Sequence, residues 1–498
     1  MTDYLLGLDS GLTVTKAVVF RTDGTVVATA RREIRQIKAT PRHVERDMAE
    51  HWRISAEAIR EALARASAAE GHAVQPLAVA VTGHGDGLYL LDSKGAPLGL
   101  AATSLDSRAH AVLEGWDADG VSERALELTG QRPFPSSPAP LLAHLRQAEP
   151  ARYAAIAAIL SCKDWLRYCL TGRVATDFTE SSVAFVDVST QVYSDEALAL
   201  FGLQEIGHAL PPVLMPGETA GAVTAAAAAA TGLSQGIPVA TGLHDVAACA
   251  AGSGVVGPGT IAVIAGTYSI NELLTDHPLV SLGWNARNGL ERGLWMNMSV
   301  SPASSANLDW FLQQAARDAL AAADPFASLQ AELDAVAADP SEIIYLPYLF
   351  GSPHREDVPA AFLGLRGWHS RGHMLRAVAE GIAFNHRHHI DLIDPEGRVG
   401  SVRLTGGSSR NPYFCQLFAD TLKRRVEVPA TQEAGALGAA MAAGLAVGVF
   451  ADWHDAARHT RAEIRTYSPG PQAEALAAGY ERYRAAARAM TSRDWTAA

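Results

Sequence analysis

Residues 4–20 read YLLGLDSGLTVTKAVVF, and this stretch predicts a β-hairpin at the start of the chain. Tyr4–Leu8 is an apolar strand, and Asp9-Ser10-Gly11 has the residue types of a tight turn. Thr13–Phe20 returns with β-branched residues at alternate positions, as a partly buried strand does. A third strand, Val26–Arg31, extends the hairpin.

The turn of this hairpin is a candidate phosphate site. Consecutive backbone N–H groups around Gly11 can form an anion-binding concavity, to which the Thr13 hydroxyl and the Lys16 ammonium would add further donors. Asp9 ends the first strand, where its carboxylate could hold Mg²⁺ through bound water. The structural alternative is an ordinary Asp-x-Gly hairpin turn, and the motif alone does not separate the two.

A related hairpin recurs in the second half of the chain. Thr260–Ala265 is an apolar strand, Gly266-Thr267 is a turn, and Ser269–Leu274 returns. This turn follows Gly11 by roughly half of the chain, which indicates a duplicated domain with a ligand cleft between its halves. The predicted domains are residues 1–250 and residues 251–498.

Helical and strand patterns alternate around these hairpins. Glu45–Ala69 has helical periodicity, and Leu77–Thr82 is a buried strand. Further along, Gly372–His389 reads as an amphipathic helix, Val402–Leu404 as a strand and Tyr413–Thr421 as the helix after it. The predicted fold class is therefore α/β, in layers.

Composition excludes several classes of function. Apolar residues make up 48% of the 498 residues, and the net charge is −12 without a strongly basic stretch, which argues against nucleic acid as a partner. No stretch has the length and apolar content of a membrane span, and the first residues lack a signal-peptide pattern. With only four scattered cysteines, the sequence predicts a cytoplasmic protein without disulfides.

Asp245 is the candidate catalytic residue. It lies in the stretch GLHDVAA, Gly242–Ala248, which follows a short strand and opens an alanine-rich helix. A carboxylate there could act as a general base toward a substrate hydroxyl, a role that contributes about 10²–10⁴-fold to a rate. The structural alternative is a helix N-cap.

Two further groups suggest binding roles. His84, Asp86, Asp106 and Arg108 follow predicted strands and could hydrogen-bond a polyhydroxylated ligand, although an Asp–Arg surface pair would explain part of the set. Glycines at Gly406-Gly407, near Asn411, and at Gly435 and Gly438 could let a flat ligand such as adenosine approach the backbone. A tight turn and close helix packing are the structural alternatives for these glycines.

Two motifs are interpreted as unrelated to the function. Gly252–Gly257 matches the dinucleotide fingerprint G-x-G-x-x-G, but it follows a predicted helix instead of opening one, so we interpret it as an interdomain turn. His386 and His389 share a helical face without acidic or cysteine partners at ligand spacing, so we interpret them as a solvated helix end and not a metal site. The chain also has no G-x-x-x-x-G-K-[ST] phosphate loop.

Taken together, these stretches resemble the FGGY carbohydrate kinases. The likeness runs from about residue 4 to about residue 445. It includes GLDSGLTVTKAVVF, the Asp106-x-Arg108 pair, Lys163-Asp164, Thr176-Asp177, GIPVATGLHDVAA, AGTYSI, TGGSSRNPYFCQLFAD and EAGALGAAMAAG. Each of these motifs alone is weak evidence for the family, whereas the whole set in this order is specific to it.

The resemblance implies an actin-like (ribonuclease H-like) ATPase fold in two domains, with ATP and Mg²⁺ as cofactors and a homodimer as a family expectation. It implies a role for each matching residue. Asp9 would serve Mg²⁺ and Asp245 would be the base; Gly11, Thr13, Lys16, Gly266 and Thr267 would bind phosphates; His84, Gly85, Asp86, Asp106 and His244 would line the sugar pocket; and Gly406, Gly407 and Asn411 would flank adenosine.

Some residues depart from the family pattern. Leu12 and Tyr268 replace smaller polar residues in the phosphate turns, and Ser104 stands where an aromatic residue often lies. The loop Gly83–Gly87 is similar to that of L-xylulose and erythritol kinases, so a ketopentose is the expected acceptor and a polyol the alternative. A dinucleotide-dependent oxidoreductase and a catalytically silent sugar sensor are the other readings of this sequence.

Overall fold

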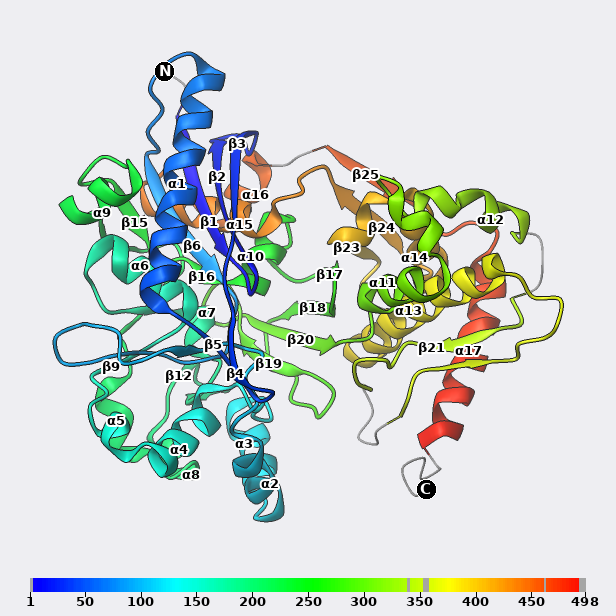
Figure 1. The fold of residues 1–498 in the computed structure, drawn as a ribbon, viewed down its shortest axis with the longest axis horizontal. Coiled ribbons are helices and arrows are strands. Elements are labelled where there is room, and N and C mark those ends of the chain that lie inside the picture. The colour runs from blue at the N-terminus through cyan, green and yellow to red at the C-terminus, as the bar shows by residue number, and fades with distance from the viewer. Residues whose placement is uncertain (1–2, 338–340, 353–357, 461–462, 492–498) are drawn as a thin grey trace. The chain divides into compact units, whose positions relative to one another are not determined.

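The structure is a computed structural model that describes residues 3–337, 341–352, 358–460 and 463–491, and its chain divides into two compact units (Figure 1). The first unit contains Met1–Pro258, Leu274–Asn297 and Glu433–Ala462. The second contains Gly259–Leu273, Met298–Gln432 and Glu463–Ala498. The chain therefore returns to the first unit twice after leaving it.

A mixed sheet forms the centre of the first unit, with the strand order β14-β15-β6-β1-β2-β3 and with β16 also paired to β6. The predicted opening hairpin is confirmed, since β1 and β2 are antiparallel neighbours, and β1 runs parallel to β6 on its other side. The strands are β1 (Tyr4–Ser10), β2 (Val14–Arg21), β3 (Val26–Glu33), β6 (Ala78–Gly83), β14 (Thr219–Ala222), β15 (Pro238–Ala240) and β16 (Leu243–His244).

Helices cover both faces of this sheet (Figure 1). Because side chains alternate along a strand, Leu6 and Leu8 of β1 face one side, where they join the apolar core formed with α1. Gly7 and Asp9 face the other side, toward α15. The covering helices are α1 (Met48–Glu70), α6 (Cys162–Thr171), α9 (Ala225–Thr231), α10 (Asp245–Gly252), α15 (Ala434–Ala446) and α16 (Trp453–His459).

Helix α1 begins later than the sequence predicted. Glu45 and Arg46 belong to β5 (His43–Arg46), which pairs with β8 (Ala101–Ala102). The helix starts after Asp47, because the Asp47 side chain accepts a hydrogen bond from the backbone N–H of Glu50 and caps the first turn.

Glycines allow α15 to pack closely on α10 and β1. A Cβ atom added to Gly438 would lie 2.0 Å from the Ala248 carbonyl oxygen, and one added to Gly7 would lie 2.0 Å from that of Ala436. Close packing, the structural alternative named for Gly438, therefore accounts for that glycine.

The remaining elements of the first unit form smaller layers, with a second apolar cluster that includes Leu142, Phe185 and Phe201. Its other strands are β4 (Ile37–Thr40), β7 (Tyr89–Leu91), β9 (Ala158–Leu160), β10 (Thr176–Asp177), β11 (Val186–Asp187), β12 (Val192–Tyr193), β13 (Val213–Leu214) and β19 (Asn285–Asn288). Its other helices are α2 (His110–Ala118), α3 (Val121–Thr129), α4 (Pro138–Ala148), α5 (Pro150–Ala154), α7 (Phe178–Ser181) and α8 (Asp195–Leu200).

The second unit repeats the strand arrangement of the first. Its sheet contains the order β20-β18-β17-β23-β24-β25, in which the antiparallel hairpin β17–β18 lies beside the parallel strand β23, as β1–β2 lies beside β6. The predicted duplication of the fold is therefore visible in the topology. The strands are β17 (Thr260–Ala265), β18 (Ser269–Thr275), β20 (Trp295–Ser301), β23 (Ser401–Thr405), β24 (Arg425–Pro429) and β25 (Ile464–Tyr467).

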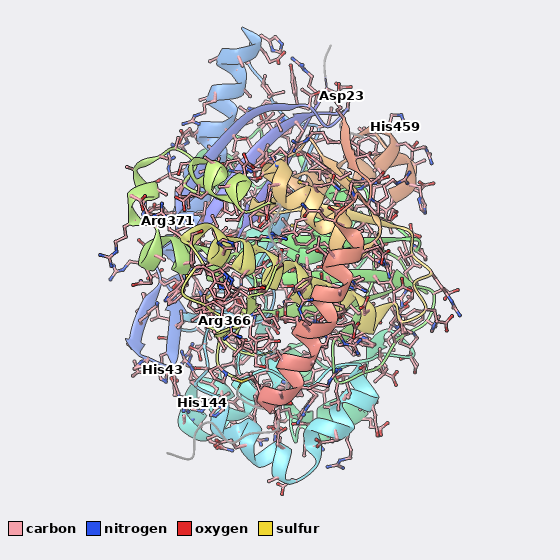
Figure 2. The ribbon with its side chains drawn as sticks, turned by 90° about the vertical axis from the view of Figure 1, so that its right-hand side faces the viewer. Asp23, His43, His144, Arg366, Arg371 and His459 are labelled. Atoms are coloured by element: carbon pink, nitrogen blue, oxygen red, sulfur yellow. The ribbon has the colours of Figure 1, made fainter. Side chains whose placement is uncertain are left out.

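Long helices complete the second unit. The C-terminal α17, which faces the viewer in Figure 2, packs against α13 and α14. Arg371, labelled in Figure 2, is at the start of α13. It is ion-paired with Asp318 and Glu332. The elements are α11 (Ser305–Ala315), α12 (Gln330–Ala335), α13 (Arg371–Ile393), α14 (Pro412–Leu422), α17 (Ala473–Thr491) and the hairpin β21 (Ile344–Leu346) and β22 (Ala361–Leu363).

The structure tests the interpretation of the two motifs that the sequence analysis treated as unrelated to the function. Gly252 ends helix α10, so the G-x-G-x-x-G stretch does not open a helix. The prediction of a solvated helix end for His386 and His389 was wrong, because both side chains are buried against polar residues of β18 and β20. Among the described helices, none combines the length and apolar content that crossing a bilayer requires.

Candidate active site

Three strands of the first unit bring the predicted catalytic residues to one edge of the sheet. β1 and β16 both run parallel to β6, so their carboxyl ends meet at the same edge. In this register Asp9 lies opposite Thr82, and His244 lies opposite Gly83. Asp9, the loop after Gly83 and Asp245 therefore gather at one place.

Asp245 is the first residue of α10, and it is not a conventional cap. The N-cap position belongs to His244, whose side chain makes no capping bond. The Asp245 Oδ1 atom accepts a hydrogen bond of 2.8 Å from the adjacent Val246 N–H, and the side chain remains 34% exposed. Burial raises the pKa of Asp245 to about 7, and the neighbouring Asp9 carboxylate also raises it. A base with this pKa is well matched to neutral pH.

The raised pKa of Asp245 predicts an acid limb in the pH–rate profile. Because a base must be ionised to accept a proton, kcat/KM for the acceptor should fall about tenfold per pH unit below pH 7. Steady-state rates in buffers of constant ionic strength, with fixed free Mg²⁺ and ATP, measure this. A limb near pH 4, where an ordinary aspartate titrates, would contradict the prediction.

Asp9 is ion-paired with Lys16, and Gly435 lies close to its carboxylate. The Lys16 ammonium lies 3.9 Å from Asp9 and 2.9 Å from Glu433, which directly precedes α15. A Cβ atom on Gly435 would lie 3.0 Å from Asp9 Oδ2, so the glycine leaves room beside the carboxylate. Burial raises the pKa of Asp9 despite Lys16, so a cation there would favour its charged form. The donor set fits Mg²⁺, which uses one or two carboxylates together with water and phosphate oxygens.

Arg46 holds the first of the two turns that were predicted to bind phosphate. This buried side chain donates hydrogen bonds of 3.2 Å and 2.6 Å to the carbonyl oxygens of Gly11 and Leu12. The Gly11 N–H is donated to the Val14 carbonyl, so Gly11 itself does not offer a donor to phosphate. Any anion at this turn would use the N–H groups of Leu12 and Thr13.

His84 is buried and neutral at the same edge. Its two ring nitrogens lie 3.1 Å from the Gly85 carbonyl and from the Tyr89 hydroxyl. Burial, together with the charge of Arg46, lowers the pKa of His84 to about 4, so the ring is uncharged at neutral pH. Its backbone N–H is donated to Ser10, which ties the loop to the end of β1.

Gly85 permits the close packing of His244. A Cβ atom added to Gly85 would lie 1.7 Å from His244 Nε2, which is a direct overlap. The imidazole is buried, and its pKa is lowered well below the usual value by burial and by Arg287.

Gly85→Ala is therefore expected to displace His244 and the adjacent Asp245, lowering kcat/KM for the acceptor about 100-fold. Steady-state kinetics measure this loss. Gly115→Ala is the matched control, since nothing lies within 4 Å of its added Cβ atom and activity should be unchanged. A wild-type kcat/KM in Gly85→Ala would show that the position of the His244 ring does not affect catalysis.

Asp86 lies close to Arg287, a residue that the sequence analysis did not identify. Arg287 of β19 is buried, lies 3.8 Å from Asp86 Oδ1 and 3.4 Å from His244 Nε2, and donates to Gln131 Oε1 at 3.0 Å. The Ser137 hydroxyl also donates to Asp86, at 3.3 Å. Arg287 carries no motif, and only the tertiary contacts of β19 bring it to the loop.

Asp106 forms a buried network of its own. Its carboxylate accepts hydrogen bonds from the Val44 and Arg108 backbone N–H groups and from two nitrogens of the Arg108 guanidinium. Arg108 also pairs with Glu45 at 2.8 Å. These four bonds use the acceptor capacity of the carboxylate, so its predicted role in the sugar pocket has no support from the geometry.

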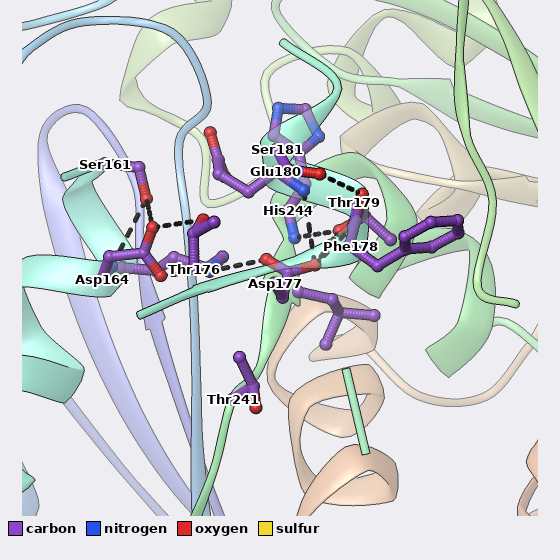
Figure 3. Close-up of polar contacts among 12 residues, drawn as sticks. Ser161, Asp164, Thr176, Asp177, Phe178, Thr179, Glu180, Ser181, Thr241 and His244 are labelled. Carbon is purple, nitrogen blue, oxygen red and sulfur yellow. Dashed lines mark hydrogen bonds and ion pairs between the residues drawn. The ribbon is translucent and has the colours of Figure 1, made fainter. Parts of the chain in front are cut away.

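A second network, to whose residues the sequence analysis assigned no role, lies behind His244 (Figure 3). The buried Lys163 ammonium lies 2.6 Å from both Asp164 and Asp177. Asp177 Oδ1 accepts the Thr179 hydroxyl proton at 2.5 Å, and the Thr179 oxygen accepts the His244 N–H at 2.9 Å (Figure 3). This chain of contacts fixes the backbone that enters α10.

The second unit gathers the predicted nucleotide residues. β17 and β23 are parallel with Ile264 opposite Thr405, so the Gly266-Thr267 turn and Gly406 follow adjacent strand ends. Gly406 has φ +90°, and its added Cβ atom would lie 2.7 Å from Ala265, which requires glycine there. Asn411 caps α14 through its side chain.

Carboxylates, turns at strand ends and a polar loop are groups that phosphoryl transfer can use. Two family models match the chain, the N-terminal domain of the FGGY family of carbohydrate kinases over residues 4–252 and its C-terminal domain over residues 261–447. The chain belongs to the FGGY family of carbohydrate kinases. It is a kinase that phosphorylates an alcohol group with ATP, as the sequence predicted.

Relatives of known name agree with this class. The chain is 33% identical to the L-xylulose/3-keto-L-gulonate kinase of Escherichia coli (strain K12), over 97% of this chain and 96% of that protein. It is 30% identical to the erythritol kinase of Brucella abortus (strain 2308), over 90% and 88% of the two chains. The crystal structure of xylulose kinase from Rhodospirillum rubrum superposes with a TM-score of 0.87 at 28% identity, over 98% of each chain.

Proposed function

We propose that this kinase transfers the γ-phosphate of MgATP to a hydroxyl group of a ketopentose such as L-xylulose. The observation that carries the proposal is Asp245 with its raised pKa, at the same sheet edge as the loop of His84 and Asp86. The similarity to an L-xylulose/3-keto-L-gulonate kinase along nearly the whole chain favours this acceptor. The similarity to an erythritol kinase makes a polyol the second candidate.

In this mechanism Asp245 accepts the proton of the attacking hydroxyl, while neutral His84 and the loop Gly85-Asp86 orient the acceptor. Arg46 holds the turn whose free N–H groups would face the phosphates. Asp9 would hold Mg²⁺ through water, and this ion neutralises phosphate charge when bound. In the second unit, Gly266 and Thr267 would contact phosphate, and the residues proposed to flank adenosine are Gly406, Gly407 and Asn411.

Further expectations from the sequence accompany this proposal. The N-terminal domain, residues 1–250, would provide the acceptor site and the base. The C-terminal domain, residues 251–498, would provide the adenosine site. A cytoplasmic location and a homodimer remain predictions.

The test is an ADP-release assay with MgATP over ketopentoses, aldoses and polyols. A high rate with one ketopentose would establish the acceptor class. A response only to erythritol or another polyol would replace the ketopentose. Absence of turnover with every acceptor, in protein that still binds sugar, would favour a silent sensor.

A further inference from the structure

One buried carboxyl group in the first unit has no part in the network behind His244. Glu180 lies in α7, and only 6% of its surface is exposed to solvent. Its Oε2 atom has no hydrogen-bond partner among the residues that the structure describes. Since buried polar atoms are normally paired, an unpartnered oxygen next to an active site calls for a ligand as its partner.

Glu180 lines a cavity of about 50 Å³ that Asp86 also lines. A cavity needs roughly 10–15 Å³ of such space to hold one water molecule, so this one has room for a small polar group. Part of its wall is apolar, including Leu160, Phe185 and Leu210. Asp164 and Thr176, also in the wall, are already hydrogen-bonded to each other, which leaves Glu180 as the unsatisfied group.

The surroundings of Glu180 favour its neutral form. Burial raises the pKa of Glu180 well above its usual value, and Lys163 only partly opposes this. The other charged or titratable groups that face it come from several elements: Asp164 of α6, Asp177 of β10, Asp245 of α10, Asp86 of the loop after β6 and Tyr193 of β12. A neutral carboxyl group can donate one hydrogen bond and accept another, as a sugar hydroxyl can.

We propose that Glu180 is a specificity-determining residue of the acceptor site, where its carboxyl group hydrogen-bonds a sugar hydroxyl that enters the cavity beside Asp86. This inference rests on the proposed function, and it concerns a hydroxyl other than the one phosphorylated. The kinase thereby selects acceptors that carry a hydroxyl at this position. An acceptor with hydrogen there would leave Glu180 unpaired.

The test compares Glu180→Leu and Glu180→Gln with the wild type, using the best acceptor from the ADP-release assay and its monodeoxy analogues. Glu180→Leu should raise the acceptor KM about 10–100-fold, with the KM for MgATP unchanged, and should lose discrimination against one deoxy analogue. Glu180→Gln retains a donor and an acceptor, so its acceptor KM should stay within about threefold of the wild type at pH 7. As the pH rises, the acceptor KM should increase in the wild type and not in Glu180→Gln.

Equal discrimination against every deoxy analogue in the wild type and in Glu180→Leu would overturn this role and leave the kinase proposal intact. Failure of the wild type to phosphorylate any sugar or polyol would overturn the acceptor class and the role of Glu180 together. Should Glu180→Leu lower the thermal midpoint of unfolding, Glu180→Ala takes its place in the same comparison, with the same two outcomes.

Discussion

Replacement of Asp245 by asparagine is expected to lower kcat about 10²–10⁴-fold without loss of MgATP binding. The amide oxygen can still accept the hydrogen bond from the Val246 N–H, so α10 should begin as before. What the amide cannot do is take the proton of the attacking hydroxyl. Single-turnover kinetics and nucleotide titration separate the two effects.

The matched control is Asp195→Asn. Asp195 is likewise the first residue of a helix, α8, and it is exposed and outside the site. This variant should retain wild-type kcat. If Asp245→Asn also turned over at the wild-type rate, Asp245 would serve the helix alone and a different base would be required.

The second large effect is expected for Lys163→Met, in the network behind His244. The lysine is fully buried between the carboxylates of Asp164 and Asp177. Removing one partner of a buried ion pair leaves uncompensated charge and typically costs about 3–5 kcal/mol. The thermal midpoint of unfolding should fall by roughly 5 °C, as measured by calorimetry.

The pH dependence provides a second signature of this ion pair. Lys163 lowers the pKa of Asp164 against the effect of burial, so the pair stabilises the protein above the unfolded pKa of an aspartate. In Lys163→Met the buried carboxyl groups become costly to ionise, and stability should decline as pH rises. The difference from the wild type should therefore be largest at neutral pH and shrink near pH 4. The exposed Lys38, replaced by Met, should show neither effect.

The parts of the fold that could be predicted are those whose own residues show a clear pattern. β17 was predicted with its observed bounds, because apolar residues fill it and Gly266 ends it. Asp245 and His84 were recognisable as candidates because each directly follows a strand. The start of α1 was placed too early, since Glu45 fits a helix by composition and is held in β5 by pairing with β8.

The contacts that could not be predicted join residues far apart in the sequence. Lys16 and Glu433 are separated by 417 positions, and no pattern around either residue predicts their ion pair. Arg46 reaches the phosphate turn only because β5 lies beside it. His386 was expected in solvent because histidines rarely mark a core face, yet Ser269 and Asn271 of β18 provide polar partners inside the second unit.

The position of α15 has a consequence for the order in which the protein can fold during synthesis. The first unit needs Glu433–Ala462 to cover one face of its sheet, and the chain passes between the two units five times before it ends. When the ribosome has released only residues up to Pro258, the α15 face of β1 and β6 is still exposed. The N-terminal unit therefore cannot complete its core ahead of the C-terminal one, and both must mature together, late in translation, when exposed apolar surface makes chaperone contact most valuable.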